Sequence, residues 1–126
     1  MNIAILGYGT VGSGVKEIVD HAVTKSTKQL HVSYILIRKG KEKTLPYMCD
    51  DIQTILNDTD VDVVVETMGG LEPAHTYILQ ALKSGKHVVT ANKAVIAAYL
   101  KEFTDTAREH NVRIYYEAST GGGIPW

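Results

Sequence analysis

The sequence predicts an α/β fold: a single domain over residues 1–126, built on a doubly wound parallel sheet in three layers, with helices on both faces. Short apolar runs alternate along the chain with longer segments of helical period, which is the pattern of strands joined by crossover helices. The apolar runs at residues 3–6 and 61–65 are nearly continuous, as expected when both faces of a strand are buried. A length of 126 residues also fits one domain.

Six strands and four helices follow from this pattern. Asp51 can cap the second helix, Pro73 lies early in the first turn of the third, and Gly85 ends that helix. Because parallel crossovers are right-handed and consecutive strands tend to be neighbours, the economical strand order is 3-2-1-4-5-6. The expected strands are residues 3–6, 32–37, 47–48 (a short edge strand), 61–66, 87–90 and 113–116, and the expected helices are residues 11–22, 52–56, 72–84 and 94–110.

Composition and charge exclude several classes of function. The formal net charge of −1 provides no basic excess for nucleic acid. No apolar run approaches the roughly 20 residues that span a bilayer, and the chain enters its first strand at once, without the charged start of a signal peptide. Cys49 is the single cysteine, which excludes a disulfide framework and a cysteine zinc cluster. These features predict a cytoplasmic protein with no nucleic-acid or membrane partner.

A glycine-rich turn after the first strand predicts a dinucleotide-binding site. Gly7, Gly9 and Gly12 form the pattern G-x-G-x-x-G between a buried strand and an amphipathic helix, which is the context that this pattern requires. The first glycine allows a tight turn, the second leaves room for a pyrophosphate, and the third lets the helix approach the strand. Free amides at the start of the helix then face the phosphates. The pattern favours the Rossmann fold, and the alternative is a structural turn without a ligand.

The end of the second strand bears on the choice of cofactor. A site selective for NAD carries an acidic residue here, which binds the ribose hydroxyls. This sequence has Arg38 and Lys39 instead. Cations suit the 2′-phosphate of NADP, and arginine can bind it with two parallel hydrogen bonds. NADP is therefore the expected preference, with NAD still open. The alternative is a solvated basic loop, because Lys41 and Lys43 follow.

Two further loops are expected at the same crevice, because the ligand of a doubly wound sheet lies where the strand order reverses. Thr67, Met68 and Gly69 follow the fourth strand and are expected to contact the cofactor; a plain connector is the alternative. Lys93 is expected near the nicotinamide and the substrate, where its ammonium could polarise a carbonyl; the alternative is a surface lysine. Glu66 ends an otherwise apolar strand, and the sequence leaves open whether it orients the loop or is solvated.

Four segments together resemble homoserine dehydrogenase, and the match covers nearly the whole chain. They are GYGTVGSGV at residues 7–15, VETMGG at 65–70, GKHVVTANKA at 85–94 and EASTGGGIP at 117–125. The last two carry motifs more specific than the glycine turn. The resemblance implies an NAD(P)-dependent interconversion of L-homoserine and L-aspartate 4-semialdehyde by hydride transfer, a step toward threonine, methionine and isoleucine.

The resemblance also implies roles for single residues. In this family a sodium ion lies near the domain hinge and is held largely by main-chain carbonyls, which are ligands that suit a hard cation. A glycine-rich hinge without metal is the alternative. The positions that match the sodium ligands are Glu117, Thr120, Gly122 and Ile124. The expected cofactor-binding residues are Gly7, Gly9, Thr10, Val11, Gly12, Arg38, Lys39, Thr67, Met68, Gly69 and Lys93, with Arg38 at the 2′-phosphate and Thr67 and Lys93 at the nicotinamide end.

The family's catalytic lysine and aspartate lie in a substrate domain beyond residue 126, and residues 117–126 are expected to begin the hinge to it. No catalytic residue is therefore expected in this chain, although Lys93 is a candidate contact of the amino-acid substrate. We expect the chain to bind cofactor without oxidising homoserine, and to be monomeric where the full-length enzyme is a homo-oligomer. Two alternatives stay open: a stand-alone nicotinamide-nucleotide-binding or redox-sensing module, and another Rossmann reductase acting on a small amino acid or imine.

Overall fold

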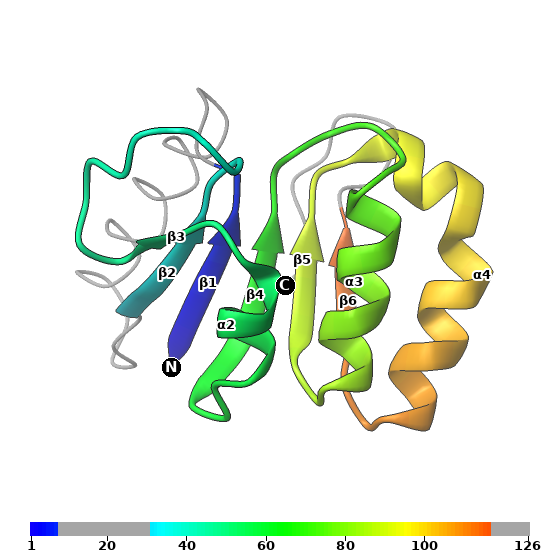
Figure 1. Cartoon of the computed structure of the whole chain (residues 1–126). Helices are drawn as coiled ribbons and strands as arrows, with labels where there is room; N and C mark the ends of the chain where they lie inside the picture. Colours follow the sequence, from blue (N-terminus) through cyan, green and yellow to red (C-terminus); the bar gives the residue numbers. More distant parts are fainter. Residues whose placement is uncertain (8–30, 117–126) are drawn as a thin grey trace, which may run out of the picture.

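A computed structural model describes residues 1–7 and 31–116 of the chain (Figure 1). In this part of the chain, three helices and a six-stranded parallel sheet alternate along the sequence. The strands are β1 (Asn2–Leu6), β2 (His31–Leu36), β3 (Met48–Cys49), β4 (Val61–Glu66), β5 (His87–Thr90) and β6 (Ile114–Tyr116), and the helices are α2 (Ile52–Leu56), α3 (Ala74–Lys83) and α4 (Lys93–Glu109).

The strand order is β3-β2-β1-β4-β5-β6 with every pairing parallel, which confirms the predicted order 3-2-1-4-5-6. Leu6 at the end of β1 is level with Leu36 of β2 and with Glu66 of β4. The pairing continues just past the strands, because the Gly7 amide donates to the Leu36 carbonyl and the Thr67 amide to the Leu6 carbonyl. The chain segments that leave β1, β2 and β4 therefore meet at one edge of the sheet, where the strand order reverses.

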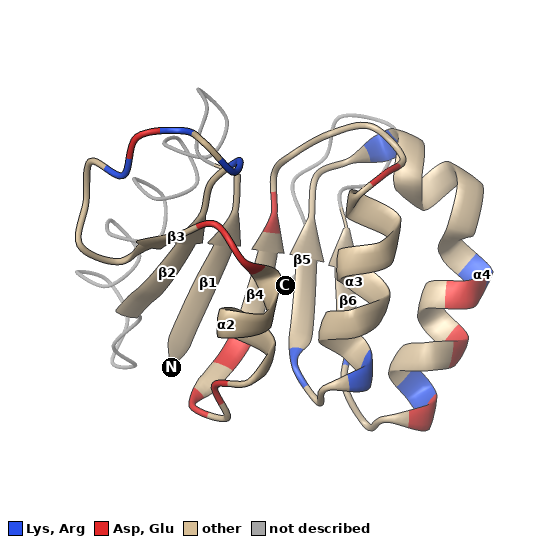
Figure 2. Cartoon of the chain, viewed as in Figure 1, with Lys and Arg blue, Asp and Glu red and all other residues tan. Residues whose placement is uncertain are grey.

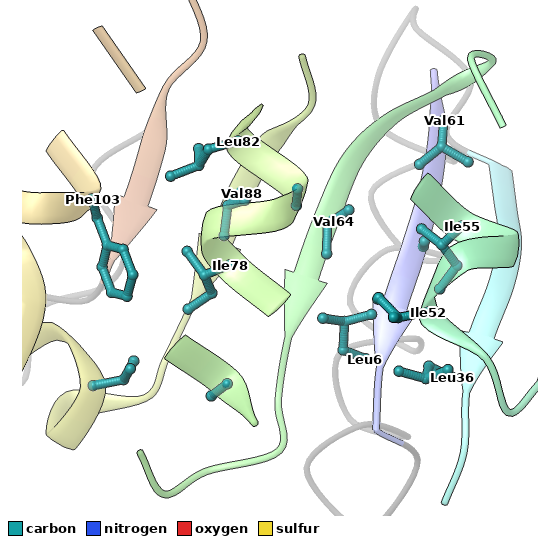
Figure 3. Packing of buried hydrophobic residues seen from close by; sticks show 14 of the residues in the cluster. Leu6, Leu36, Ile52, Ile55, Val61, Val64, Ile78, Leu82, Val88 and Phe103 are labelled. Carbon is teal, nitrogen blue, oxygen red and sulfur yellow. The ribbon is translucent and has the colours of Figure 1, made fainter. Parts of the chain in front are cut away.

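The helices α2, α3 and α4 cover one face of the sheet (Figure 1). Alternate strand residues face these helices, and Figure 3 shows Leu6, Val64 and Val88 of the strands in one buried cluster with Ile78 and Phe103 of the helices. All five of these side chains are completely buried. The intervening strand residues form a second buried cluster, which contains Ile3, Ile5, Ile35, Ile37, Met48, Val65 and Val89. Both faces of the strands are thus buried, as their continuous apolar runs predict.

The ends of the helices follow local capping chemistry. The Asp51 side chain accepts from the Gln53 amide at 2.9 Å and starts α2, as the sequence predicts. Gly85, at φ +84°, ends α3, and the amide after it donates to the Ala81 carbonyl in a Schellman arrangement. At α4 the Asn92 side chain accepts from the Val95 amide, so this helix starts at Lys93, one residue earlier than predicted.

One predicted element is not tested by the structure, and another is shifted by one residue. The helix predicted for residues 11–22 lies outside the described residues, so the third layer is not tested there. The edge strand lies at Met48–Cys49, one residue later than predicted. Within the described ranges, no helix has the length and apolar character that crossing a bilayer requires.

Candidate functional site

A groove of about 1120 Å³ lies at the edge of the sheet where β1, β2 and β4 end. Its walls come from the turn after β1, the loop after β2 and the loop between β4 and α3, which arches over this edge in Figure 1. A smaller hollow of about 140 Å³ adjoins it, lined by Thr67, Gly69, Ala91 and Asn92. Because Thr67 and Gly69 line both, the two hollows are neighbours, and together they make a path from the end of β2 to the end of β5. Such a crevice at the carboxyl ends of parallel strands is where open α/β sheets bind ligands.

Gly7 lines the larger hollow at a place where a side chain has no room. Its φ is +100°, which only glycine adopts easily, and a Cβ atom here would lie 3.0 Å from Thr67 Oγ1 and 3.1 Å from Met68 Cγ. The chain leaving β1 thus packs directly against the loop leaving β4. Of the predicted glycine-turn residues, Gly9, Thr10, Val11 and Gly12 lie outside the described residues.

One end of the groove is basic. Arg38, Lys39 and Lys41 line it, and all three side chains are exposed. Figure 2 shows these charges on the loop that follows β2. Asp50, which follows the edge strand β3, lines the same end; its carboxylate lies 3.9 Å from the Lys43 ammonium. Sequence reasoning missed Asp50, although an acid directly after a parallel strand is a signal that could have found it.

The other end of the groove is built on the loop of residues 67–70. The Thr67 hydroxyl donates to the Leu6 carbonyl at 2.8 Å and so ties this loop to the end of β1. The amides of Met68 and Gly69 donate to one oxygen, Oε2, of Glu66, at 2.8 Å and 3.1 Å. These two amides point to Glu66, and Thr67, Met68 and Gly69 line the groove.

Glu66 is completely buried, which decides a question that the sequence leaves open: it orients the loop and is not solvated. Besides the two loop amides, it accepts from the Thr90 hydroxyl at its other oxygen, and Asn92 Nδ2 lies 3.5 Å from Oε2. The Thr90 hydroxyl in turn accepts from the Asn92 amide at 3.0 Å, so its own proton is directed to Glu66. Every described contact of Glu66 comes from a donor, so both oxygens of this buried side chain have hydrogen-bond partners.

Lys93 is the first residue of α4. It lies just beyond the carboxyl end of β5, as the sequence predicts. Its side chain is exposed, and it is absent from the walls of both hollows. The residue before it, Asn92, does line the smaller hollow. In the described structure Lys93 is thus beside the path and not in it.

His75, in the first turn of α3, has a specific environment. Its two ring nitrogens contact the carboxylates of Glu72 and Glu102, and its ring stacks on Tyr99 at a centroid distance of 3.8 Å. Partial burial lowers the pKa of His75, but the hydrogen bonds and charges of Glu102 and Glu72 outweigh it, so that the pKa is raised overall. His75 therefore links α3 to α4 and does not line the groove.

Metal ligands cannot be assigned in the described ranges, where no group of three or more His, Cys, Asp or Glu side chains could hold an ion. The positions predicted to bind sodium, Glu117, Thr120, Gly122 and Ile124, lie outside those ranges.

A doubly wound parallel sheet with a groove at its switch point, Gly7 in the groove and cations at one end define a nucleotide-binding domain of the Rossmann class. Residues 7–117 match the family model described as the NAD binding domain of homoserine dehydrogenase. The chain belongs to this family, which confirms the resemblance drawn from its sequence motifs.

Individual relatives agree with this assignment. The chain is 45% identical to the homoserine dehydrogenase of Synechocystis sp. and 40% identical to that of Bacillus subtilis, over 99% of its own length in each case. It also matches a crystal structure of the Thiobacillus denitrificans homoserine dehydrogenase, with a TM-score of 0.87 and 34% identity, over 99% of this chain and 31% of that one. The chain spans only 30% of the Synechocystis relative and 31% of the B. subtilis relative.

Proposed function

We propose that this chain binds NADP in the groove, with the adenosine 2′-phosphate at Arg38 and Lys39 and the nicotinamide toward Thr67, Met68 and Gly69. The observation that carries the proposal is the basic end of the groove, where Arg38, Lys39 and Lys41 occupy the place of the acid that selects NAD. A hyperthermophilic archaeal homoserine dehydrogenase in complex with NADPH supports it: that structure matches 92% of this chain, with a TM-score of 0.77 and 28% identity.

The residues of the groove fit a dinucleotide. The volume of the groove, about 1120 Å³, slightly exceeds the roughly 300–1,000 Å³ that is typical of pockets for small ligands. Gly7 leaves the backbone bare beside β1, where a diphosphate needs close approach to main-chain amides. Bound NADP supplies the acceptor or donor of a hydride. The described residues of this chain bind it, orient it and hold its nicotinamide end between the loops that follow β4 and β5.

We further propose that the chain is the coenzyme-binding part of an enzyme that interconverts L-homoserine and L-aspartate 4-semialdehyde. Family membership supports this, and the chain covers about a third of the length of such enzymes. Lys93, the first residue of α4, is the proposed contact of this chain with the amino-acid substrate. We expect the pure chain to bind the cofactor without oxidising homoserine. Steady production of NADPH from homoserine and NADP by the pure chain would refute the expectation that the chain does not oxidise homoserine.

The redox-sensing alternative has less support. A redox sensor that works through a thiol needs a cysteine that is easily deprotonated. Burial raises the pKa of the Cys49 thiol, so its reactive thiolate form is disfavoured at neutral pH. No other cysteine is present in the chain.

The experiment that tests the proposal is titration of the chain with NADPH and with NADH. Arg38→Ala is expected to weaken NADPH binding by about tenfold, because it removes a charged hydrogen-bonding partner of the phosphate, and to leave NADH binding nearly unchanged. The matched control is Lys83→Ala, which removes one exposed positive charge from the last turn of α3, away from the groove. An equal loss for both nucleotides in Arg38→Ala would remove the 2′-phosphate role.

A further inference from the structure

We propose that Glu66 is a positioning residue: its buried carboxylate locks the loop of residues 67–70 to the segment between β5 and α4, and so fixes both walls of the nicotinamide end of the groove. The inference rests on the proposed function, because it gives that end of the groove to the nicotinamide. It adds a residue that lies behind the groove wall and is absent from the lining of both hollows.

The contacts of Glu66 divide between the two walls. On one side its Oε2 atom receives the amides of Met68 and Gly69, which fixes the backbone of the loop after β4. On the other side its Oε1 atom receives the hydroxyl of Thr90, the last residue of β5. Glu66 and Thr90 are paired in register on adjacent strands, so one carboxylate spans the ends of both.

Asn92 completes the connection from the opposite direction. Its side-chain Nδ2 donates to the Gly70 carbonyl at 2.6 Å, while its Oδ1 accepts from the Val95 amide and caps α4. Asn92 is buried and immediately precedes Lys93. The position of the start of α4, and with it the backbone of Lys93, is therefore tied to the same loop that Glu66 holds.

The need for a carboxylate here is geometric. Burial of a charge is costly, and an apolar residue at the end of β4 would fill the space without that cost. Gly69 and Gly70 have φ values of +77° and +72°, in the left-handed region, so the loop takes a course that an unconstrained chain samples among many others. The hydrogen bonds from the Met68 and Gly69 amides to Glu66 Oε2 favour this one loop conformation over the others. The smaller hollow, lined by Gly69 on one side and Asn92 on the other, exists only while both walls keep their places.

The test compares two ligands on the same variant. Glu66→Gln keeps the shape of the side chain but turns one acceptor oxygen into a donor, which conflicts either with the two loop amides or with the Thr90 hydroxyl. NADPH reports on the whole groove, whereas adenosine 2′,5′-diphosphate has the adenosine half without nicotinamide. We expect Glu66→Gln to weaken NADPH about tenfold, as for loss of a charged hydrogen bond. We expect it to change the affinity for adenosine 2′,5′-diphosphate by less than about twofold.

The control is Ile78→Val, which removes a methyl group from the fully buried core of α3 and destabilises the fold without touching either wall. It is expected to bind both ligands as the unchanged chain does. If Glu66→Gln weakens both ligands equally, or neither, Glu66 is only structural and the inference is wrong. If the unchanged chain binds neither ligand, the proposed cofactor function fails first, and this inference with it.

A second variant keeps the test decisive if Glu66→Gln does not fold. Asn92→Ser retains an oxygen that can cap α4 but is too short to donate to the Gly70 carbonyl. It is expected to show the same selective loss for NADPH. Equal affinity of Asn92→Ser and the unchanged chain for NADPH would overturn the inference.

Discussion

The two ends of the groove are built on opposite principles. At the end near β2, Arg38 and Lys39 are exposed cations on a loop, and they provide charge. At the end near β5, a buried carboxylate and a buried amide, Glu66 and Asn92, fix two loops through hydrogen bonds of defined geometry. The first end can attract a phosphate from solution, and the second can hold a ring in one orientation.

This difference predicts how each end responds to change. Exposed charges contribute little to folding, so the basic end can vary with cofactor preference at small cost in stability. The Glu66 network supports the fold and the site at once, because Glu66, Thr90 and Asn92 are buried and water does not readily replace a lost partner there. Changes at that end are therefore expected to alter stability and binding together.

The largest expected effect separates the two ends by stability. Glu66→Ala leaves the Met68 and Gly69 amides and the Thr90 hydroxyl without their acceptor, and we expect it to lower the free energy of unfolding by about 3–5 kcal/mol. Lys39→Ala, at the other end, is expected to change it by less than about 0.5 kcal/mol. Urea denaturation followed by circular dichroism measures both. Similar values for the two variants would contradict the contrast.

A smaller effect is expected at the junction between the ends. Gly7→Ala forces a Cβ to within 3.0 Å of Thr67 Oγ1 at a φ of +100°. We expect a loss of stability of about 1–3 kcal/mol, together with weaker binding of NADPH and of adenosine 2′,5′-diphosphate, because the turn borders both ends. Gly40→Ala is the matched control, since it also has positive φ but nothing within 4 Å of a new Cβ. Both variants introduce backbone strain, and only Gly7→Ala adds steric crowding. The difference between the two variants in thermal unfolding and in titration therefore measures the crowding.

The salt dependence of NADPH binding tests the role of charge at the basic end without any mutation there. Raising the ionic strength from about 0.05 M to 0.5 M shortens the screening length and is expected to weaken NADPH binding several-fold. The ratio of affinities between the unchanged chain and Glu66→Gln is expected to stay constant, because the buried network is hardly screened. A ratio that falls toward one at high salt would show that Glu66 acts through long-range charge and not through loop geometry.

The smallest effect concerns His75, behind the groove. Its pKa is raised in the folded chain, so the protonated ring contributes stability that is present below its unfolded pKa of about 6.5 and is lost as the pH rises through the folded pKa. The melting temperature of the chain is therefore expected to fall slightly between about pH 6 and pH 8. His75→Gln is expected to flatten this slope. An unchanged slope in that variant would assign the pH dependence to another group.

Much of the fold could be predicted because its signals are local. Continuous apolar runs marked the buried strands, and Asp51 and Gly85 marked helix ends by chemistry that acts within a few residues. The basic loop at Arg38 and Lys39 was visible for the same reason, since its position depends only on the end of β2. The first glycine of the turn could also be assigned a structural reason before the contact with Thr67 was seen.

The network behind the groove could not be predicted in this way. Thr90 lies 24 residues and Asn92 26 residues along the chain from Glu66, and nothing near Glu66 in the sequence indicates that they share a carboxylate. The same holds for His75, whose partner Glu102 is 27 residues away on the next helix. Such pairings depend on the register of neighbouring strands and on the packing of α3 against α4.

The sequence by itself determined the order of strands and helices, the strand order in the sheet, and the charge at one end of the groove. These features follow from hydrophobic period, turn residues and charge, which depend only on residues close together in the chain. Tertiary structure alone decided that Glu66 is buried and shared between two loops, and that Lys93 lies beside the groove. The physical reason is that a parallel sheet aligns the ends of distant strands, and burial then allows only those polar groups that find partners across that alignment.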